Sequence, residues 1–174
     1  MKKILFNKEQ IDSKVLELAN IINTKIIQEN EMEKPILLCV LDGGFRFYSD
    51  LISHIDQPIL CDFIKITSYT RKEQGDIKVH KFPKYPIRGN DIIIIDDIYD
   101  TGNTIDFLLK ELEIRNPNSI SIVTLLHRKG KPEIDKYSYY TGFVIDDEWV
   151  AGYGLDDFEG TSRNLNYIYE LEKR

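Results

Sequence analysis

Hydrophobic residues along the chain alternate between short continuous runs and segments of helical periodicity. Continuous apolar runs bounded by polar residues are typical of strands that are buried on both faces of a parallel sheet. Three such runs lie at 36–41, 92–95 and 119–126. Apolar residues recur at helical spacing at 11–29, 45–52 and 105–112. The alternation of the two patterns predicts an α/β fold.

Weaker patterns add to this prediction. Less regular apolar segments are interpreted as further strands at 59–68, 77–82 and 139–144. Asn7 is predicted to cap the first helix, with Gln10 as its capping-box partner. Residues 1–7 are interpreted as an apolar lead-in that could form an edge strand. The stretch LNYIYEL, at 165–171, is interpreted as a polar turn before a charged tail.

The segment DIIIIDDIYDTGNTIDFLLK, at 91–110, carries the clearest candidate chemistry. Its isoleucine run ends in two carboxylates, Asp96 and Asp97, and a third, Asp100, precedes a short loop and a helix. In an open parallel sheet, the carboxyl ends of the strands face the ligand crevice. These acids and the loop that follows them are therefore expected to lie in a binding site.

The loop Thr101-Gly102-Asn103-Thr104 has the composition of a phosphate cradle. Gly102 lets the backbone turn so that N–H groups point inward, while the two threonines add hydroxyl donors at the positive end of the next helix. It is not a P-loop, because the GxxxxGK[ST] pattern is missing. Adjacent acids beside a phosphate indicate Mg²⁺ or ribose hydroxyls. The alternative is a buried strand whose acids cap the next helix, as in phosphoacceptor domains.

Composition and charge restrict the class of protein. A chain of 174 residues fits one domain with a sizeable core. A net charge of −6 and a pI near 5.1 argue against nucleic acid as a partner, because phosphate backbones call for a basic surface. Cys39 and Cys61 lie in apolar runs, as buried thiols of a reduced compartment do. No stretch has the length of a membrane span or the form of a signal peptide, so a cytoplasmic protein without membrane contact is expected.

The central segment also resembles a known signature. IIIIDDIYDTGNT, at 92–104, is similar to the signature with which type I phosphoribosyltransferases bind phosphoribosyl pyrophosphate (PRPP). VLDGGFRFYSDL, DFIKITSY, GDIKV and WVAGYGLD resemble successive blocks of the hypoxanthine-guanine phosphoribosyltransferases, in the same order. The resemblance implies one domain over 1–174, with a mainly parallel five-stranded sheet flanked by helices. A small hood would form from the N-terminal lead-in and residues 145–174.

The resemblance implies a role for each part of the central segment. Asp96 and Asp97 would hold the ribose hydroxyls and Mg²⁺, and residues 101–104 would hold the 5-phosphate. Asp100 would act as the catalytic base that takes the N7 proton of the purine. A flexible lid at about 68–80, which includes Ser68 and Tyr69, would cover bound PRPP and exclude water.

Four further residues are implied to bind pyrophosphate: Asp42, Gly43, Gly44 and Arg163. The family can contain a cis peptide bond in this loop, which here would join Leu41 to Asp42. Asp42 is electrostatically unfavourable beside pyrophosphate unless its side chain points away or meets Mg²⁺. Arg163 departs from the family pattern, since it follows Asp156 by seven residues where six are expected.

The purine-binding residues that the resemblance implies are Arg128, Lys129, Trp149, Val150 and Asp156. Either Arg128 or Lys129 could donate to the 6-oxo group of the base. Trp149 would stack on the purine ring, although a core or interface tryptophan is an equal alternative on sequence alone. Val150 would offer backbone groups to the base edge, and Asp156 would assist Mg²⁺.

The function that these features predict is purine salvage. The enzyme would transfer 5-phosphoribosyl from PRPP to N9 of hypoxanthine or guanine, which yields a purine nucleotide and pyrophosphate. One alternative is an enzyme that prefers xanthine. Another is a non-catalytic regulator on the same fold that senses PRPP or a nucleotide, although the basic patch or extra domain that it would need is missing from the sequence. Relatives imply a homodimer or homotetramer.

Overall fold

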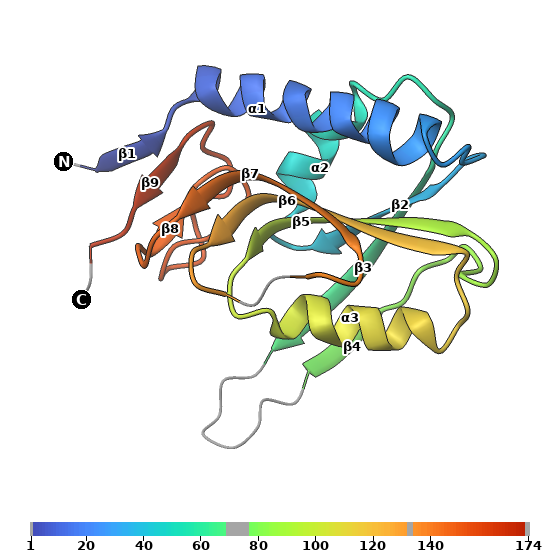
Figure 1. Cartoon of the computed structure of the whole chain (residues 1–174). Coiled ribbons are helices and arrows are strands. Elements are labelled where there is room, and N and C mark those ends of the chain that lie inside the picture. Colours follow the sequence, from blue (N-terminus) through green and yellow to red (C-terminus); the bar gives the residue numbers. More distant parts are fainter. Residues whose placement is uncertain (1, 69–76, 132–133, 173–174) are drawn as a thin grey trace.

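The computed structural model of the protein describes residues 2–68, 77–131 and 134–172. Its central element is a sheet with the strand order β4-β3-β2-β5-β6-β7 (Figure 1). The strands are β2 (Ile36–Leu41), β3 (Leu60–Ser68), β4 (Ile77–Lys81), β5 (Asp91–Tyr99), β6 (Ser119–Arg128) and β7 (Ser138–Ile145). Five of these strands are parallel, in agreement with the predicted mainly parallel sheet. The strand predicted at 77–82 is the antiparallel β4, and it makes the described sheet six-stranded where five strands were predicted.

Helices cover both faces of this sheet. Figure 1 shows α1 (Lys8–Ile21) and α2 (Phe45–Ile52) over one face and α3 (Asn103–Glu113) over the other. The isoleucines of β5 alternate between the two faces, since Ile93 and Ile95 belong to the core cluster under α1 and α2, whereas Ile92 and Ile94 belong to the cluster under α3. This double burial explains the continuous apolar run in the sequence.

The first helix begins as predicted and changes geometry near its end. Asn7 accepts a hydrogen bond from the Gln10 backbone N–H at 2.9 Å, and the Gln10 side chain accepts one from the Asn7 N–H at 3.0 Å. The predicted capping box is thus confirmed. The helix continues to Gln28, near the predicted end, but Ile22–Gln28 form a π-helix that was not predicted.

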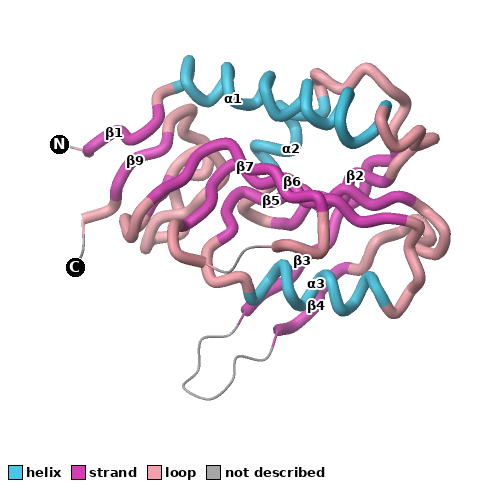
Figure 2. The backbone as a smooth tube through the Cα atoms, viewed as in Figure 1, coloured by secondary structure: helices cyan, strands magenta, loops and turns pink. Residues whose placement is uncertain are grey.

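A second sheet joins the two ends of the chain, and we call it the hood sheet. It contains β1 (Lys3–Phe6), β9 (Ile168–Glu170) and β8 (Val150–Ala151) in the order β1-β9-β8. Figure 2 shows β1 and β9 side by side at the end of the molecule where both termini lie. The prediction of a polar turn at 165–171 was therefore wrong, because Ile168 and Tyr169 are buried in a strand that pairs with both neighbours.

The segment after β8 is tied to α2 of the central unit. The Tyr153 hydroxyl donates to Asp50 Oδ2 at 2.7 Å, and Arg46 donates to the backbone carbonyl of Asn164 at 3.3 Å. The Arg46 guanidinium also lies 5.3 Å from the centre of the Tyr153 ring.

Within the described residues, no helix is long and apolar enough to cross a membrane.

Replacing the cap of α1 tests the local basis of the fold. Asn7→Ala removes the acceptor of the capping box, so the free energy of unfolding should fall by about 1 kcal/mol. Chemical denaturation monitored by circular dichroism measures this change. Asn20→Ala, at an exposed position inside the same helix, should cause no loss, because alanine favours helix interiors. Equal stability of Asn7→Ala and the unmodified protein would contradict the role of the cap.

Candidate active site

The two acids that were predicted to follow the central strand lie within it. Asp96 and Asp97 are residues of β5, which extends to Tyr99, and this corrects the prediction that the strand ends before them. The strand continues because β6 runs alongside it and pairs Asp96 with Thr124 and Tyr99 with His127. Both carboxylates are buried, and each accepts the backbone N–H of the next residue, at 2.9 and 2.8 Å.

Burial governs the electrostatics of this pair. Loss of hydration raises the pKa of Asp96 well above its ordinary value, and the neighbouring Asp97 carboxylate raises it further. Burial also raises the pKa of Asp97, an effect that hydrogen bonds from Asp96 and Ile98 and the charge of Arg163 oppose. Negative charge on this pair is therefore unfavourable in the unliganded protein, and a cation or hydroxyl donors would stabilise it.

The loop after β5 turns tightly into α3. Gly102 has a φ of 86°, and a Cβ at this position would lie 2.9 Å from the Tyr99 hydroxyl, so glycine fits both the conformation and the space. Thr101 Oγ1 accepts from the Asn103 N–H at 3.4 Å, and α3 begins at Asn103. The first turn of this helix, which includes Thr104, therefore follows closely on the end of β5.

A glycine turn after β2 packs directly against the acid pair. A Cβ on Gly43 would lie 1.8 Å from Asp97 Oδ2, and a Cβ on Gly44 would lie 2.6 Å from the carbonyl oxygen of Val40. Only glycine fits at either position without a shift of its neighbours. The peptide bond between Leu41 and Asp42 is cis, as the family resemblance implied.

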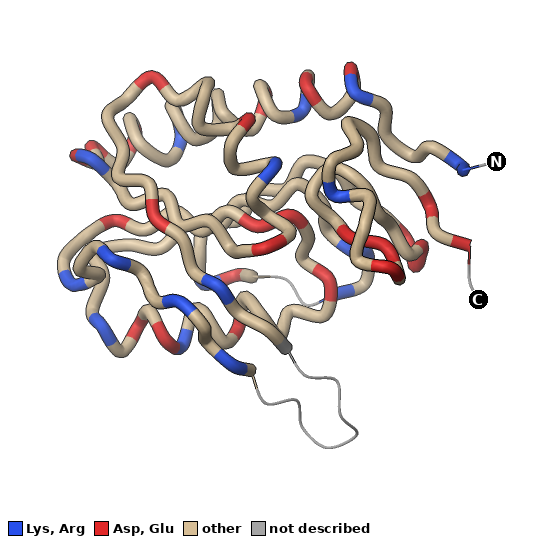
Figure 3. Tube along the Cα trace, turned by 180° about the vertical axis from the view of Figure 1, so that it is seen from behind, with Lys and Arg blue, Asp and Glu red and all other residues tan. Residues whose placement is uncertain are grey.

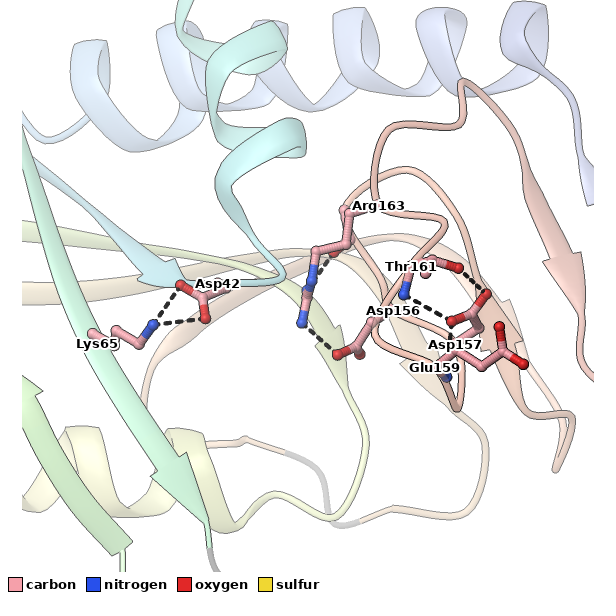
Figure 4. A network of polar contacts seen from close by, with 8 residues as sticks. Asp42, Lys65, Asp156, Asp157, Glu159, Thr161 and Arg163 are labelled. Carbon is pink, nitrogen blue, oxygen red and sulfur yellow. Dashed lines mark hydrogen bonds and ion pairs between the residues drawn. The ribbon is translucent and has the colours of Figure 1, made fainter.

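The structure also explains how this turn tolerates an aspartate. Lys65 on β3 donates from Nζ to both carboxylate oxygens of Asp42, at 2.9 and 2.8 Å (Figure 4). The ion pair compensates the negative charge of Asp42. Sequence reasoning assigned no role to Lys65, although a lysine that interrupts an apolar strand was a signal that could have found it.

Arg163 reaches the same region from the hood side despite the extra residue before it. Its guanidinium donates to Asp156 Oδ2 at 2.6 Å and to the carbonyl of Gly154 at 2.5 Å (Figure 4). A Cβ on Gly154 would lie 2.2 Å from the carbonyl oxygen of Gly43, so the hood segment contacts the glycine turn directly.

The loop between Asp156 and Arg163, in which the resemblance implies an extra residue, is held together by hydrogen bonds to one of its own side chains. The Asp157 carboxylate accepts hydrogen bonds from the backbone of Glu159 and Thr161 and from the hydroxyls of Thr161 and Ser162. These donors, above all the two hydroxyls, hold the pKa of Asp157 below its usual range. The Asp157 side chain therefore stabilises the loop to which it belongs.

The side chains of the two candidate cations for the purine, Arg128 and Lys129, point in different directions. Arg128 is 14% exposed and points inward, where Nε donates to Asp100 Oδ1 at 2.5 Å and Nη1 donates to the carbonyls of Asp146 and Glu148. The Lys129 side chain is 74% exposed, and its Nζ lies 3.5 Å from Asp146. The Arg128–Asp100 contact, which joins the ends of β6 and β5, was not predicted.

The remaining predicted residues lie on the hood or at the lid. Trp149 is 58% exposed, with its ring centre 6.2 Å from that of Phe158, so it is not a core tryptophan. Val150 is buried in β8. Ser68 is the last residue of β3, whereas Tyr69 and most of the predicted lid lie outside the described residues.

The acid pair has donor atoms that fit a metal ion bound together with a phosphate-containing ligand. Among the described residues, no group of three or more histidine, cysteine or acidic side chains could hold a metal ion by itself. Mg²⁺ is commonly bound through one or two carboxylates together with phosphate oxygens of the substrate. Asp96 and Asp97 provide hard oxygen donors of this kind, and Asp156 lies in the hood segment that contacts the glycine turn through Gly154.

Comparison with known proteins identifies the class to which this fold and site belong. Residues 4–157 match the phosphoribosyl transferase domain, and the chain belongs to this family, with the type I fold. Similar proteins include the hypoxanthine-guanine-xanthine phosphoribosyltransferase of Tritrichomonas foetus, 34% identical over 99% of this chain and 93% of that protein. The hypoxanthine-guanine phosphoribosyltransferase of Bacillus subtilis is 36% identical over 99% and 94%. A crystal structure of the Bacillus anthracis hypoxanthine-guanine phosphoribosyltransferase has a TM-score of 0.87 at 34% identity and covers 99% of both chains.

The buried acid pair makes a prediction about stability. Because the folded state raises the pKa of Asp96, the charged side chain opposes folding increasingly as the pH rises above the ordinary pKa of aspartate. Asp96→Asn should therefore increase the free energy of unfolding at pH 7 by about 1 kcal/mol. Urea denaturation measures the change, which should vanish at a pH low enough to protonate aspartate in both states. Asp135→Asn, at an exposed position, is the control, and a less stable Asp96→Asn at pH 7 would refute the argument.

Proposed function

We propose that the protein is a purine salvage enzyme that transfers 5-phosphoribosyl from PRPP to N9 of hypoxanthine or guanine and releases pyrophosphate. The observation that carries the proposal is the convergence of three elements at the carboxyl ends of neighbouring strands. These are the acid pair of β5, the loop at 100–104 and the glycine turn at 42–44. PRPP contains a ribose, a 5-phosphate and a pyrophosphate. Its binding therefore requires three such sites close enough together to contact one molecule.

The proposed reaction is a displacement at the anomeric carbon of the ribose. N9 of the purine forms a bond to this carbon while the bond to the pyrophosphate oxygen breaks, and its electron pair leaves with pyrophosphate. The purine loses the proton on N7, for which Asp100 is the proposed acceptor. Arg128, held by two backbone carbonyls, fixes the position of the Asp100 carboxylate.

Each ligand part has proposed partners among the described residues. Asp96 and Asp97 would accept from the ribose hydroxyls, and the N–H groups and hydroxyls of 101–104 would donate to the 5-phosphate. The N–H groups of the glycine turn and the Arg163 guanidinium would bind pyrophosphate. Mg²⁺, for which Asp96, Asp97 and Asp156 are the proposed residues, would neutralise charge on the leaving pyrophosphate.

The purine is proposed to lie between the hood and the end of β6. Trp149 presents an exposed indole ring on which a flat heterocycle can stack. Of the two cations predicted for the 6-oxo group, Arg128 is favoured, because its side chain points toward Asp100 whereas Lys129 extends into solvent. The backbone of Val150 is proposed to bind the edge of the base. Ser68 and Tyr69 are proposed to cover bound PRPP as part of the lid.

Two wider properties extend the proposal. A cytoplasmic location is supported by Cys39 and Cys61, which both carry free thiols. Assembly as a homodimer or homotetramer remains a prediction from the family resemblance, and light scattering after size exclusion would determine it.

The direct test is pyrophosphate release from PRPP in the presence of Mg²⁺, with hypoxanthine, guanine, xanthine and adenine offered separately. Turnover with hypoxanthine or guanine, and none with adenine, is expected. Xanthine is included because the Tritrichomonas relative is named for it, and a preference for xanthine would replace the proposed specificity. Binding of PRPP by calorimetry without turnover of any base would favour a non-catalytic regulator.

Substitution of Asp100 tests its proposed role as the base. Asp100→Ala should lower kcat by about 100-fold or more, because proton transfer contributes this much to typical reactions, while the affinity for PRPP should change little. Asp100→Asn keeps an oxygen that can accept from Arg128, so an equal loss in this variant assigns the effect to the missing base. Asp135→Ala serves as the control. A matching loss of PRPP binding would reject the assignment.

A further inference from the structure

Lys65 lies beside the proposed pyrophosphate site. The assignments above give its ammonium group no role in binding a ligand. It lies near the end of β3 and pairs in register with Leu41, the residue that precedes the glycine turn. Its ammonium group contacts both oxygens of Asp42, the first residue of that turn (Figure 4). Strand pairing thus brings a cation to the edge of the turn.

The surroundings of the turn are otherwise strongly acidic. Asp96 and Asp97 lie on one side, and Asp156 lies on the hood side, where Arg163 partly compensates it. Figure 3 shows acidic segments gathered in the loops of the hood, while Lys and Arg residues are spread along the outer strands. A pyrophosphate group carries several negative charges, so a further cationic contact beside Arg163 and the proposed Mg²⁺ would favour its binding here.

The Asp42–Lys65 pair is easily opened. The Lys65 side chain is 39% exposed and that of Asp42 is 50% exposed, so water screens their attraction. Exposed ion pairs of this kind stabilise proteins little. An anion of higher charge can therefore compete with Asp42 for a flexible lysine whose three N–H donors can be redirected without moving the backbone.

We propose that Lys65 is a second pyrophosphate-binding residue, which Asp42 holds beside the turn until the diphosphate group of substrate or product arrives. This inference rests on the proposed function. Arg163 has the same arrangement on the other side of the turn, where a half-exposed aspartate holds its guanidinium. The two cations, each held by one aspartate, flank the site from β3 and from the hood (Figure 4).

The competing explanation is that the pair only braces the turn. The two explanations differ in what removal of each partner does. If the pair is a brace, Asp42→Asn and Lys65→Met break the same contact and weaken pyrophosphate binding alike. If Lys65 binds the anion, Lys65→Met removes a ligand, whereas Asp42→Asn removes only its competitor.

The test is calorimetric titration of the full chain with pyrophosphate in the presence of Mg²⁺. Lys65→Met should raise the Kd about tenfold, since a hydrogen bond between charged groups is typically this strong. Asp42→Asn should bind as tightly as the unmodified protein or more tightly, and the double variant should resemble Lys65→Met. Lys65→Arg, which keeps the charge, should restore most of the affinity. The KM for PRPP should rise in Lys65→Met with little change in kcat.

Lys81→Met is the matched control. Lys81 lies opposite Lys65 in the β3–β4 ladder and carries the same charge, but its ammonium lies over the Phe63 ring, 4.9 Å from the ring centre. Its removal should leave the Kd for pyrophosphate nearly unchanged. An equal effect of Lys81→Met would reduce the role of Lys65 to general charge and overturn the proposal.

Two other results would also overturn it. One is a Lys65→Met variant that binds pyrophosphate like the unmodified protein, and the other is equal weakening in Asp42→Asn and Lys65→Met. Both results can be told apart from failure of the proposed function, which is shown by an unmodified protein that turns over no purine with PRPP. Thermal denaturation of each variant shows that it is folded before its affinity is interpreted.

Discussion

The carboxylate of Asp97 occupies the space where a side chain on residue 43 would lie, and much of the site depends on this contact. The Asp97 carboxylate on β5 and the glycine turn after the neighbouring strand β2 lie so close together that even a methyl group on residue 43 would clash. The same turn meets the hood through the carbonyl of Gly43, against which Gly154 packs. Three regions that are distant in the sequence are therefore fixed relative to one another by positions that tolerate only glycine.

The acid pair also explains why the site is built on a strand and not on a loop. A strand with neighbours on both sides holds its side chains in fixed directions, and hydrogen bonds from the following N–H groups orient both carboxylates. The arrangement costs stability, because both groups are removed from water without a fixed cationic partner in direct contact among the described residues. Because burial disfavours their charged form, hydroxyl donors or a cation beside them would stabilise that form.

Much of this architecture could be predicted from the sequence, because double burial leaves continuous apolar runs and capping leaves a local signature. The Ile92–Ile95 run and the Asn7 cap are examples. The extension of β5 through its acids could not be predicted, since it follows from the length of β6. The strand at Ile168–Glu170 escaped prediction because three residues are too few for a period, and its pairing with β1 joins opposite ends of the chain.

Within the site, residue types were predicted more readily than their partners. The family resemblance pointed to Asp42, Asp100, Arg128 and Arg163, but ion pairs between strands depend on register, which a single sequence does not reveal. The contacts of Lys65 with Asp42 and of Arg128 with Asp100 are of this kind. They also show that a charge which looks misplaced in the sequence can have its compensation on a neighbouring strand.

The loop between Asp156 and Arg163 has a consequence for how such a chain can vary over time. Asp157 accepts hydrogen bonds from the donors of its own loop, so the loop is stabilised from within and does not depend on contacts with the rest of the site. Insertions and deletions are usually most harmful beside functional groups. A turn that carries its own hydrogen bonds is expected to tolerate a change in length better than one held by its neighbours, because the added residue needs no partner outside the loop.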